Sequence, residues 1–244
     1  MYWWCSVGKQ AGFSLIELAL VLVILTLALG GALVPLNAQI EYKQWHDTEQ
    51  RLEVVHAALL GFVVRNGRLP CPANNASNGV ESPVNGGVCT NPYDGYVPAV
   101  SLGLDQLDAQ GYVLDAWGNR LRYAVAKSAA AAFTTTDGIK NAGLSTLQSE
   151  LQVCAAVAGT TSSNCGSAVA LSSSGTNAPP AIIYSIGKNA AASSADEVAN
   201  QDNNAIFVSH TLTTAAAATG MFDDVVIWLS PNVLYGQMVA AGMF

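Results

Sequence analysis

The first strong pattern in the chain is a run of apolar residues near its start. Residues 13–36 read FSLIELALVLVILTLALGGALVPL, and Glu17 is the only charged side chain among them. About 20 apolar residues are enough for a helix to cross the hydrocarbon core of a bilayer. The pattern therefore predicts a membrane-spanning helix over 13–36. Gly30, Gly31 and Pro35 are expected to weaken it locally.

The helical pattern continues past this run but changes character. Over residues 37–67, apolar side chains recur at steps of three and four among charged ones: Leu52, Val55, Leu59 and Phe62. This spacing puts them on one helix face, and Gly67 is a helix stop. We therefore expect one helix from Phe13 to Asn66, apolar all round in its first half and amphipathic in its second. The amphipathic half needs a partner, most simply a sheet.

The rest of the chain indicates short strands joined by long connections. Residues 68–111 are rich in Pro, Gly and Asn and read as a long loop. Five strand segments are expected: 121–126, 151–157, 181–186, 205–209 and 225–229. The Ala- and Ser-rich spacers between them are read as loops, or alternatively as short helices, and 231–244 as a C-terminal helix. The predicted fold class is α+β, a long N-terminal helix on an antiparallel sheet.

Composition narrows the environment of the chain. Of 244 residues, 51% are hydrophobic and only 11% charged, against a usual charged share of about 25%. Net charge is −7 and no run of Lys or Arg occurs, so nucleic acid is not an expected partner. Four cysteines follow the apolar run: Cys71, Cys89, Cys154 and Cys165. No C-x-x-C occurs, so disulfides are favoured over reduced or zinc-bound cysteines. Among the three possible connectivities, we expect the one that closes two local loops, 71–89 and 154–165.

The apolar run could be a signal peptide, a lipoprotein signal or a plain signal anchor, and Glu17 helps to choose among them. A secretory signal peptide has a shorter apolar core, of about 7–15 residues, and a lipoprotein would need a cysteine just after it. A plain signal anchor fits the length but leaves Glu17 unexplained. A carboxylate inside a membrane helix is costly and is a functional-site hypothesis by default.

Residues 9–18, KQAGFSLIEL, resemble the type IV prepilin signal: a short basic leader ending in Gly, then an aromatic residue, then Glu at the fifth position. The resemblance implies that prepilin peptidase cuts between Gly12 and Phe13 and methylates the new amine of Phe13. It also implies that Glu17 neutralises the amine of an adjacent subunit during assembly. Lys9, ahead of the run, favours a cytoplasmic N-terminus.

The resemblance to type IV pilins and type II secretion pseudopilins implies the whole organisation. Residues 1–12 are the leader, 13–36 the transmembrane and filament-core helix, 37–67 its amphipathic extension and 68–244 a periplasmic head. The expected protein is a structural subunit, a minor pilin or pseudopilin, and not an enzyme, with no cofactor. Its expected partners are prepilin peptidase, other subunits, the inner-membrane assembly platform and the membrane. It would sit in the inner membrane and then in a pilus or pseudopilus.

Two further segments resemble pseudopilin and minor pilin elements, RLPCP at 68–72 and DAWGNRLRY at 115–123. In those families the second marks a turn that enters the first strand of the sheet, and Asp, Gly and Asn predict a turn unaided. Trp117 and Tyr123 are then expected in the core.

The chain carries no familiar catalytic motif: G-x-S-x-G, H-E-x-x-H and the phosphate-binding loop are absent. The three histidines are expected to be solvated or capping: His46, His56 and His210. A periplasmic binding or enzymatic domain on a plain signal anchor is the alternative function.

Five acidic residues lie close together in sequence in the last fifty residues: Asp196, Glu197, Asp202, Asp223 and Asp224. Oxygen ligands suit Ca²⁺, and residues 184–187 and 223–225 loosely resemble those around the calcium loop of major pseudopilins. Lys188 and Asn189 replace the acidic step expected there. We therefore expect solvated loop carboxylates and assign no metal, with calcium as the alternative.

Overall fold

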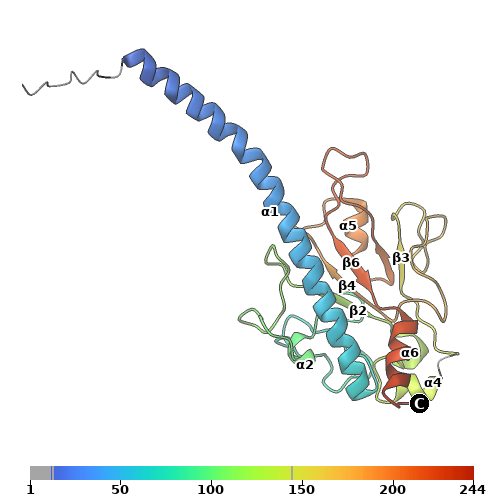
Figure 1. Cartoon of the computed structure of the whole chain (residues 1–244). Helices are drawn as coiled ribbons and strands as arrows, with labels where there is room; N and C mark the ends of the chain where they lie inside the picture. Colours follow the sequence, from blue (N-terminus) through green and yellow to red (C-terminus); the bar gives the residue numbers. More distant parts are fainter. Residues whose placement is uncertain (1–11, 13, 144) are drawn as a thin grey trace, which may run out of the picture. The chain divides into compact units, whose positions relative to one another are not determined.

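A computed structural model describes residues 12, 14–143 and 145–244, without the side chains of residues 28–38. Contacts divide the chain into two compact units, residues 1–44 and 45–244 (Figure 1). Among its described residues the first contains α1 as far as residue 44, and the second, called the head here, holds the rest. The fold is α+β, with an N-terminal helix and an antiparallel sheet.

Helix α1 spans Leu15–Asn66, which confirms one helix across the apolar and amphipathic segments. Phe13, where the helix was expected to begin, lies outside the described residues. The helix stops where the sequence predicts, because Gly67 has φ +67° and donates its N–H to the Val63 carbonyl at 2.8 Å. Glycine adopts this left-handed conformation without a Cβ clash.

The main sheet has four strands in the order β1-β2-β4-β6, and each neighbouring pair is antiparallel. Its strands are β1 Gly95–Tyr96, β2 Arg122–Val125, β4 Ala181–Ser185 and β6 Val225–Trp228. Three of them lie inside expected segments. The two-residue β1 is not among the expected strands, because it lies in the Pro-, Gly- and Asn-rich stretch 68–111, whose composition predicts a loop.

The other two expected strands form a separate sheet. β3, Gln152–Cys154, pairs in parallel with β5, Ile206–Val208. The expectation of one antiparallel sheet was therefore wrong for this pair. Parallel neighbours need a long crossover, and the chain supplies one that includes β4. Tyr184 and Phe207 meet edge to face, with ring centroids 5.4 Å apart, and so connect the two sheets.

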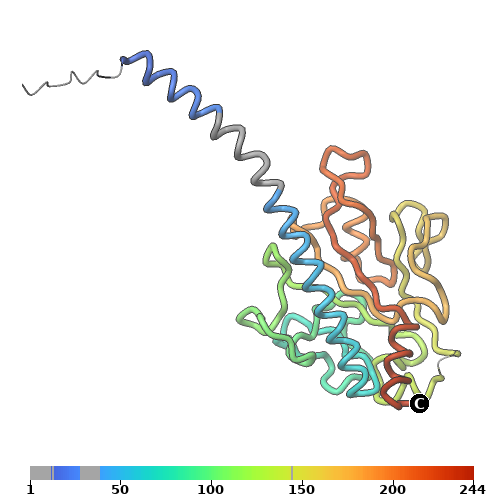
Figure 2. The backbone as a smooth tube through the Cα atoms, in the orientation of Figure 1, coloured from blue at the N-terminus to red at the C-terminus, as the bar shows by residue number. Residues whose placement is uncertain are grey.

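Five helices besides α1 occur in the described chain: α2 Ala99–Leu102, α3 Ser128–Ala131, α4 Gly138–Ala142, α5 Ala195–Ala199 and α6 Pro231–Ala240. The expected C-terminal helix is confirmed as α6. The chain ends near the end of α1 (Figure 2): a Cβ on Gly67 would lie 3.4 Å from Met243 Cε.

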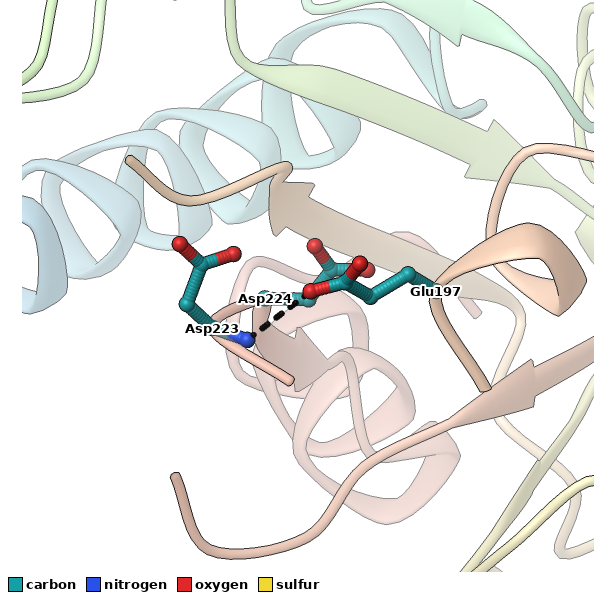
Figure 3. A group of neighbouring side chains, drawn as sticks. All are labelled: Glu197, Asp223 and Asp224. Carbon is teal, nitrogen blue, oxygen red and sulfur yellow. Dashed lines mark hydrogen bonds between the residues drawn. The ribbon is translucent and has the colours of Figure 1, made fainter. Parts of the chain in front are cut away.

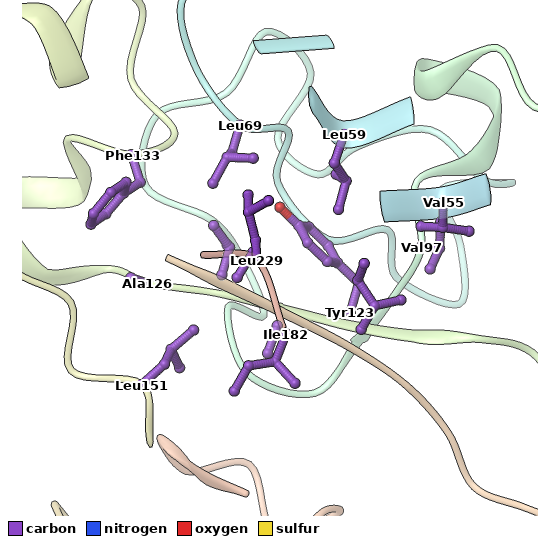
Figure 4. Packing of buried hydrophobic residues seen from close by; sticks show 14 of the residues in the cluster. Val55, Leu59, Leu69, Val97, Tyr123, Ala126, Phe133, Leu151, Ile182 and Leu229 are labelled. Carbon is purple, nitrogen blue, oxygen red and sulfur yellow. The ribbon is translucent and has the colours of Figure 1, made fainter. Parts of the chain in front are cut away.

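The core of the head is built on the α1 stripe. The four stripe residues are 0–5% exposed and belong to one cluster with the main sheet. Figure 4 shows Val55 and Leu59 facing Tyr123 of β2. Tyr123 is fully buried, as expected, and its hydroxyl donates to the Pro70 carbonyl at 3.2 Å. Trp117 is only partly buried and packs edge to face on Trp45 of α1.

The loop after α1 is fixed by two cross-links. A disulfide joins Cys71 and Cys89, and a second, Cys154–Cys165, closes the loop after β3; both are the locally closed pairs. Arg68 and Glu81 are 5% exposed and form a two-pronged ion pair with N–O distances of 2.7 and 2.8 Å. Glu81 also accepts the Cys71 N–H at 3.1 Å. A buried charge is stable only when paired in this way, so the long loop is ordered without regular structure.

The turn at residues 115–119 is built by one carboxylate. Asp115 is 2% exposed, and its Oδ1 accepts the N–H groups of Trp117 and Asn119 at 2.9 and 2.8 Å. Its Oδ2 accepts the Ser185 hydroxyl at 2.6 Å. The turn therefore leads into β2 and is tied to the end of β4, which explains the Asp of this motif physically.

Truncation of the stripe tests this packing. Leu59→Ala removes a fully buried side chain and should destabilise the head by about 2–5 kcal/mol. Val54→Ala, on the same helix but 59% exposed, should change stability by less than about 0.5 kcal/mol. Thermal melts of the full chain in detergent measure both. Equal effects of the two variants would contradict the packing of this helix face.

Candidate functional site

The first candidate site is the start of α1. Gly12 is exposed, and Phe13 lies outside the described residues. Ser14 accepts the Glu17 N–H on its hydroxyl at 3.2 Å and on its carbonyl at 3.1 Å. Ser14-Leu-Ile-Glu17 thus has the spacing of a capping box, and Glu17 occupies the first helical turn. A carboxylate there is favoured by the helix dipole, a local role that the sequence reading did not assign to Glu17.

The helix after Glu17 presents apolar side chains on every side. Ten large apolar residues between Leu15 and Leu27 are 45–88% exposed. An exposed apolar surface of this extent is typical of a site that contacts another protein or a membrane. Of the expected membrane segment 13–36, Phe13 and the side chains of residues 28–36 lie outside what the structure describes. Over the described part of the chain, no helix meets the length and hydropathy of a membrane span.

The second candidate site is a buried acidic cluster in the head. Glu197 of α5 and the adjacent pair Asp223 and Asp224, just before β6, each offer a carboxylate oxygen within 4.8 Å of the others (Figure 3). They are 0%, 6% and 3% exposed. The expectation of solvated loop carboxylates was therefore wrong for these three. Glu197 is buried because it caps α5, and the two aspartates are buried because the chain enters β6 beside that helix.

Glu197 is held by a full set of donors. It closes a capping box with Ser194, and it accepts the Ser193 N–H at 2.7 Å and hydroxyl at 2.8 Å. Asn189 donates its amide to both carboxylate oxygens at 3.2 Å, and the Asp223 N–H donates at 3.2 Å. Burial alone raises the pKa of Glu197, but these hydrogen bonds outweigh it and lower the pKa. These donors therefore favour the ionised form of Glu197.

The two aspartates are less well satisfied. Asp223 accepts the N–H groups of Lys188 and Asn189 on Oδ2, and Asp224 accepts the Asn200 amide on Oδ2 at 2.8 Å. Within the described residues, Oδ1 of each has no hydrogen-bond partner. Burial raises the pKa of Asp223, and it raises the pKa of Asp224 to about 7, with Glu197 and Asp223 adding repulsion. A proton on Asp224 or a bound cation would relieve this repulsion.

The other two acidic residues lie elsewhere. Asp196 accepts the Val157 N–H at 2.7 Å and lies 3.2 Å from Nε2 of His210. Asp202 accepts the Asn204 N–H and amide in its own loop. His210 also stacks on Phe222, with ring centroids 3.9 Å apart, so the expectation of a solvated or capping histidine was wrong there. Five acidic residues are close in sequence, but only Glu197, Asp223 and Asp224 form a cluster in the described structure.

Comparison with known families points to the N-terminal segment. Residues 8–33 match the family model described as the prokaryotic N-terminal methylation motif. The match covers Gly12, Phe13 and Glu17 and is consistent with the type IV pilin-like and pseudopilin family. The motif is that of a substrate of prepilin peptidase. No curated protein and no solved structure matches the chain.

Asp224→Asn tests the protonation of the cluster. The folded-state pKa of Asp224, about 7, lies above its ordinary value of 3.8, so ionised Asp224 destabilises the folded state fully above pH 7. This cost declines as the pH falls from about 7 towards 4. In the presence of a chelator, we expect Asp224→Asn to melt several degrees above the parent at pH 8, since about 1 kcal/mol corresponds to roughly 2–4 °C. The difference should shrink towards pH 4. A constant difference across this range would contradict the shift.

In the presence of calcium, the parent should melt at a higher temperature than Asp224→Asn. The cluster offers three carboxylates and two free Oδ1 atoms, and oxygen ligands suit Ca²⁺. At about a hundredfold excess over the dissociation constant, a bound ion stabilises the folded state by about 2.7 kcal/mol. We expect calcium to raise the melting temperature of the parent and to leave Asp224→Asn unchanged. Identical melting curves of the parent in calcium and in chelator would exclude the ion, leaving the proton as the neutralising group.

Proposed function

We propose that this chain is a structural subunit, a minor pilin or pseudopilin, of a type IV pilus or a type II secretion pseudopilus. Prepilin peptidase would cleave it between Gly12 and Phe13 and methylate the amine of Phe13. The observation that carries the proposal is the match of residues 8–33 to the N-terminal methylation motif. Assembly, and not catalysis, is the role that such a segment serves.

The exposed apolar surface of α1 supports an assembly role. The side chains from Leu15 to Leu27 find no cover within the described chain. A bilayer could cover them before assembly, and the same surface of neighbouring copies could cover them afterwards. In this scheme residues 1–12 are the leader, 13–36 the anchor and filament core, 37–67 the extension and 68–244 the periplasmic head.

Glu17 is the residue that would fix the axial offset between neighbouring subunits in the filament. A buried carboxylate and a buried ammonium are each costly alone and offset one another as a pair. If Glu17 meets the Phe13 amine of the next subunit, only one axial offset satisfies both groups. The capping bond from the Glu17 N–H to Ser14 uses the backbone and leaves the carboxylate available for such a contact.

The proposed partners follow from this scheme. They are prepilin peptidase, other pilin or pseudopilin subunits, the inner-membrane assembly platform and the membrane itself. The chain would rest in the inner membrane with a cytoplasmic N-terminus and a periplasmic head, where an oxidising environment suits the two disulfides.

Glu17→Gln tests the assembly contact in the native host. The variant should be cleaved and methylated normally, because the leader and Phe13 are intact. It should accumulate in the membrane and lose filament incorporation at least tenfold, since removing one partner of a buried ion pair costs about 3–5 kcal/mol. Immunoblots of sheared-filament and membrane fractions measure this.

Glu53→Gln is the matched control, an exposed acid later on the same helix, and it should assemble like the parent. Parental incorporation of Glu17→Gln would contradict the proposed contact. A chain that stays in the membrane fraction in every variant, parent included, would instead indicate a plain signal anchor.

A further inference from the structure

A polar pocket lies on the head, remote in sequence from the N-terminal segment and lined by none of the clustered acids. Its volume is about 380 Å³, within the roughly 300–1,000 Å³ range of small-molecule sites. It forms where β6 ends and α6 begins (Figure 1) and where residues 171–179 pass alongside. Its polar walls are Ser172, Ser173, Asn177, Trp228, Ser230 and Asn232.

The pocket is electrically neutral. No Asp, Glu, Lys, Arg or His is among the described residues that line it. Phosphates, carboxylates and metal ions are recognised by opposite charge or by ionised ligands, and this lining supplies neither. Its hydrogen-bonding groups are hydroxyls, amides and an indole N–H, each of which donates or accepts without carrying charge. The chemistry favours an uncharged ligand with many hydroxyl groups.

Apart from the Ser172 hydroxyl, these side-chain groups make no hydrogen bond to another described residue of the protein. In the described structure, the side chains of Ser173, Asn177, Ser230 and Asn232 make no hydrogen bond to another residue, and neither does Trp228 Nε1. Ser230 precedes α6, where a serine hydroxyl ordinarily accepts a backbone N–H, yet it makes no capping bond. The Ser230 hydroxyl therefore remains available to a ligand.

The walls are nevertheless anchored. Ser172, next to Ser173, is buried and accepts the Val153 N–H on its hydroxyl at 2.9 Å. The Ser149 hydroxyl donates to the Pro179 carbonyl at 2.7 Å. On the other side, the Leu229 N–H bonds the Ala181 carbonyl at 2.9 Å, which fixes the end of β6. The backbone of both walls is therefore fixed, and binding would order mainly the side chains.

We propose that this pocket binds a neutral saccharide. The partly exposed Trp228 lines the pocket, and its indole N–H can donate to a sugar hydroxyl. Asn177 and Asn232 stand on the two flanking segments and can each donate and accept towards vicinal hydroxyls. The inference does not rest on the proposed filament role, since the pocket lies within the head whatever the N-terminal segment does.

The test uses the full chain labelled with 5-fluorotryptophan in a detergent without a sugar head group. The chain has five tryptophans, and loss of one resonance in Trp228→Phe assigns the Trp228 signal. Glucose, galactose, mannose, N-acetylglucosamine and their disaccharides are titrated to about 50 mM, because small ligands of this size bind weakly. Glucuronic and sialic acids serve as charged controls.

At least one neutral sugar should shift the Trp228 resonance saturably, with an apparent affinity at least tenfold above that of the charged sugars. Asn177→Ala and Asn232→Ala should each weaken binding at least fivefold. Both side chains are exposed and unbonded within the described chain, so folding is not at risk. Asn75→Ala, another exposed asparagine outside the pocket, should bind like the parent. The proposal fails if no sugar shifts the signal, if charged sugars bind equally well, or if the pocket variants bind like Asn75→Ala.

Discussion

The head depends on the burial of one face of α1 against the main sheet. The stripe from Leu52 to Phe62 is 0–5% exposed, and full burial of each such side chain is worth about 1.5–3 kcal/mol. Short strands of two to five residues could not form a stable sheet alone, because an isolated sheet needs a covered face. The helix supplies that cover, and the disulfide and the Arg68–Glu81 ion pair then fix the irregular loop that follows it.

A chain of polar contacts carries this order from the helix to the acidic cluster. Thr48 of α1 accepts the Ala116 N–H at 3.1 Å, and the turn that contains Ala116 is closed by Asp115. Asn119 of the same turn donates to the Gly187 carbonyl at 2.7 Å. A Cβ at Gly187 would come within 2.1 Å of Asp223 Oδ1, so only glycine allows the loop to approach the cluster this closely. The motif around Trp117 is therefore a structural connector between α1 and the cluster.

The sequence predicted the elements whose evidence is local. The 3.6-residue period predicts the buried stripe, Gly67 predicts the end of α1, and the short apolar segments between polar spacers predict five of the six strands. Pairing is not local, so the parallel β3–β5 sheet was missed. Burial of the acids could not be predicted either, because it follows from how α5 and β6 pack, although Ser194-x-x-Glu197 is visible as a capping box. In contrast, the methylation motif needs no tertiary structure, since consecutive residues carry it.

The central claim is that the chain is processed as a prepilin, and intact mass with N-terminal sequencing of the protein from its native membranes tests this most directly. The account predicts a chain that begins at N-methylated Phe13 and lacks residues 1–12. A chain that begins at Met1, or at Gln39 because signal peptidase cut after Leu36-Asn37-Ala38, would contradict it. Glu17 would then have no subunit amine to meet, and the exposed apolar helix would be only an anchor or a discarded signal.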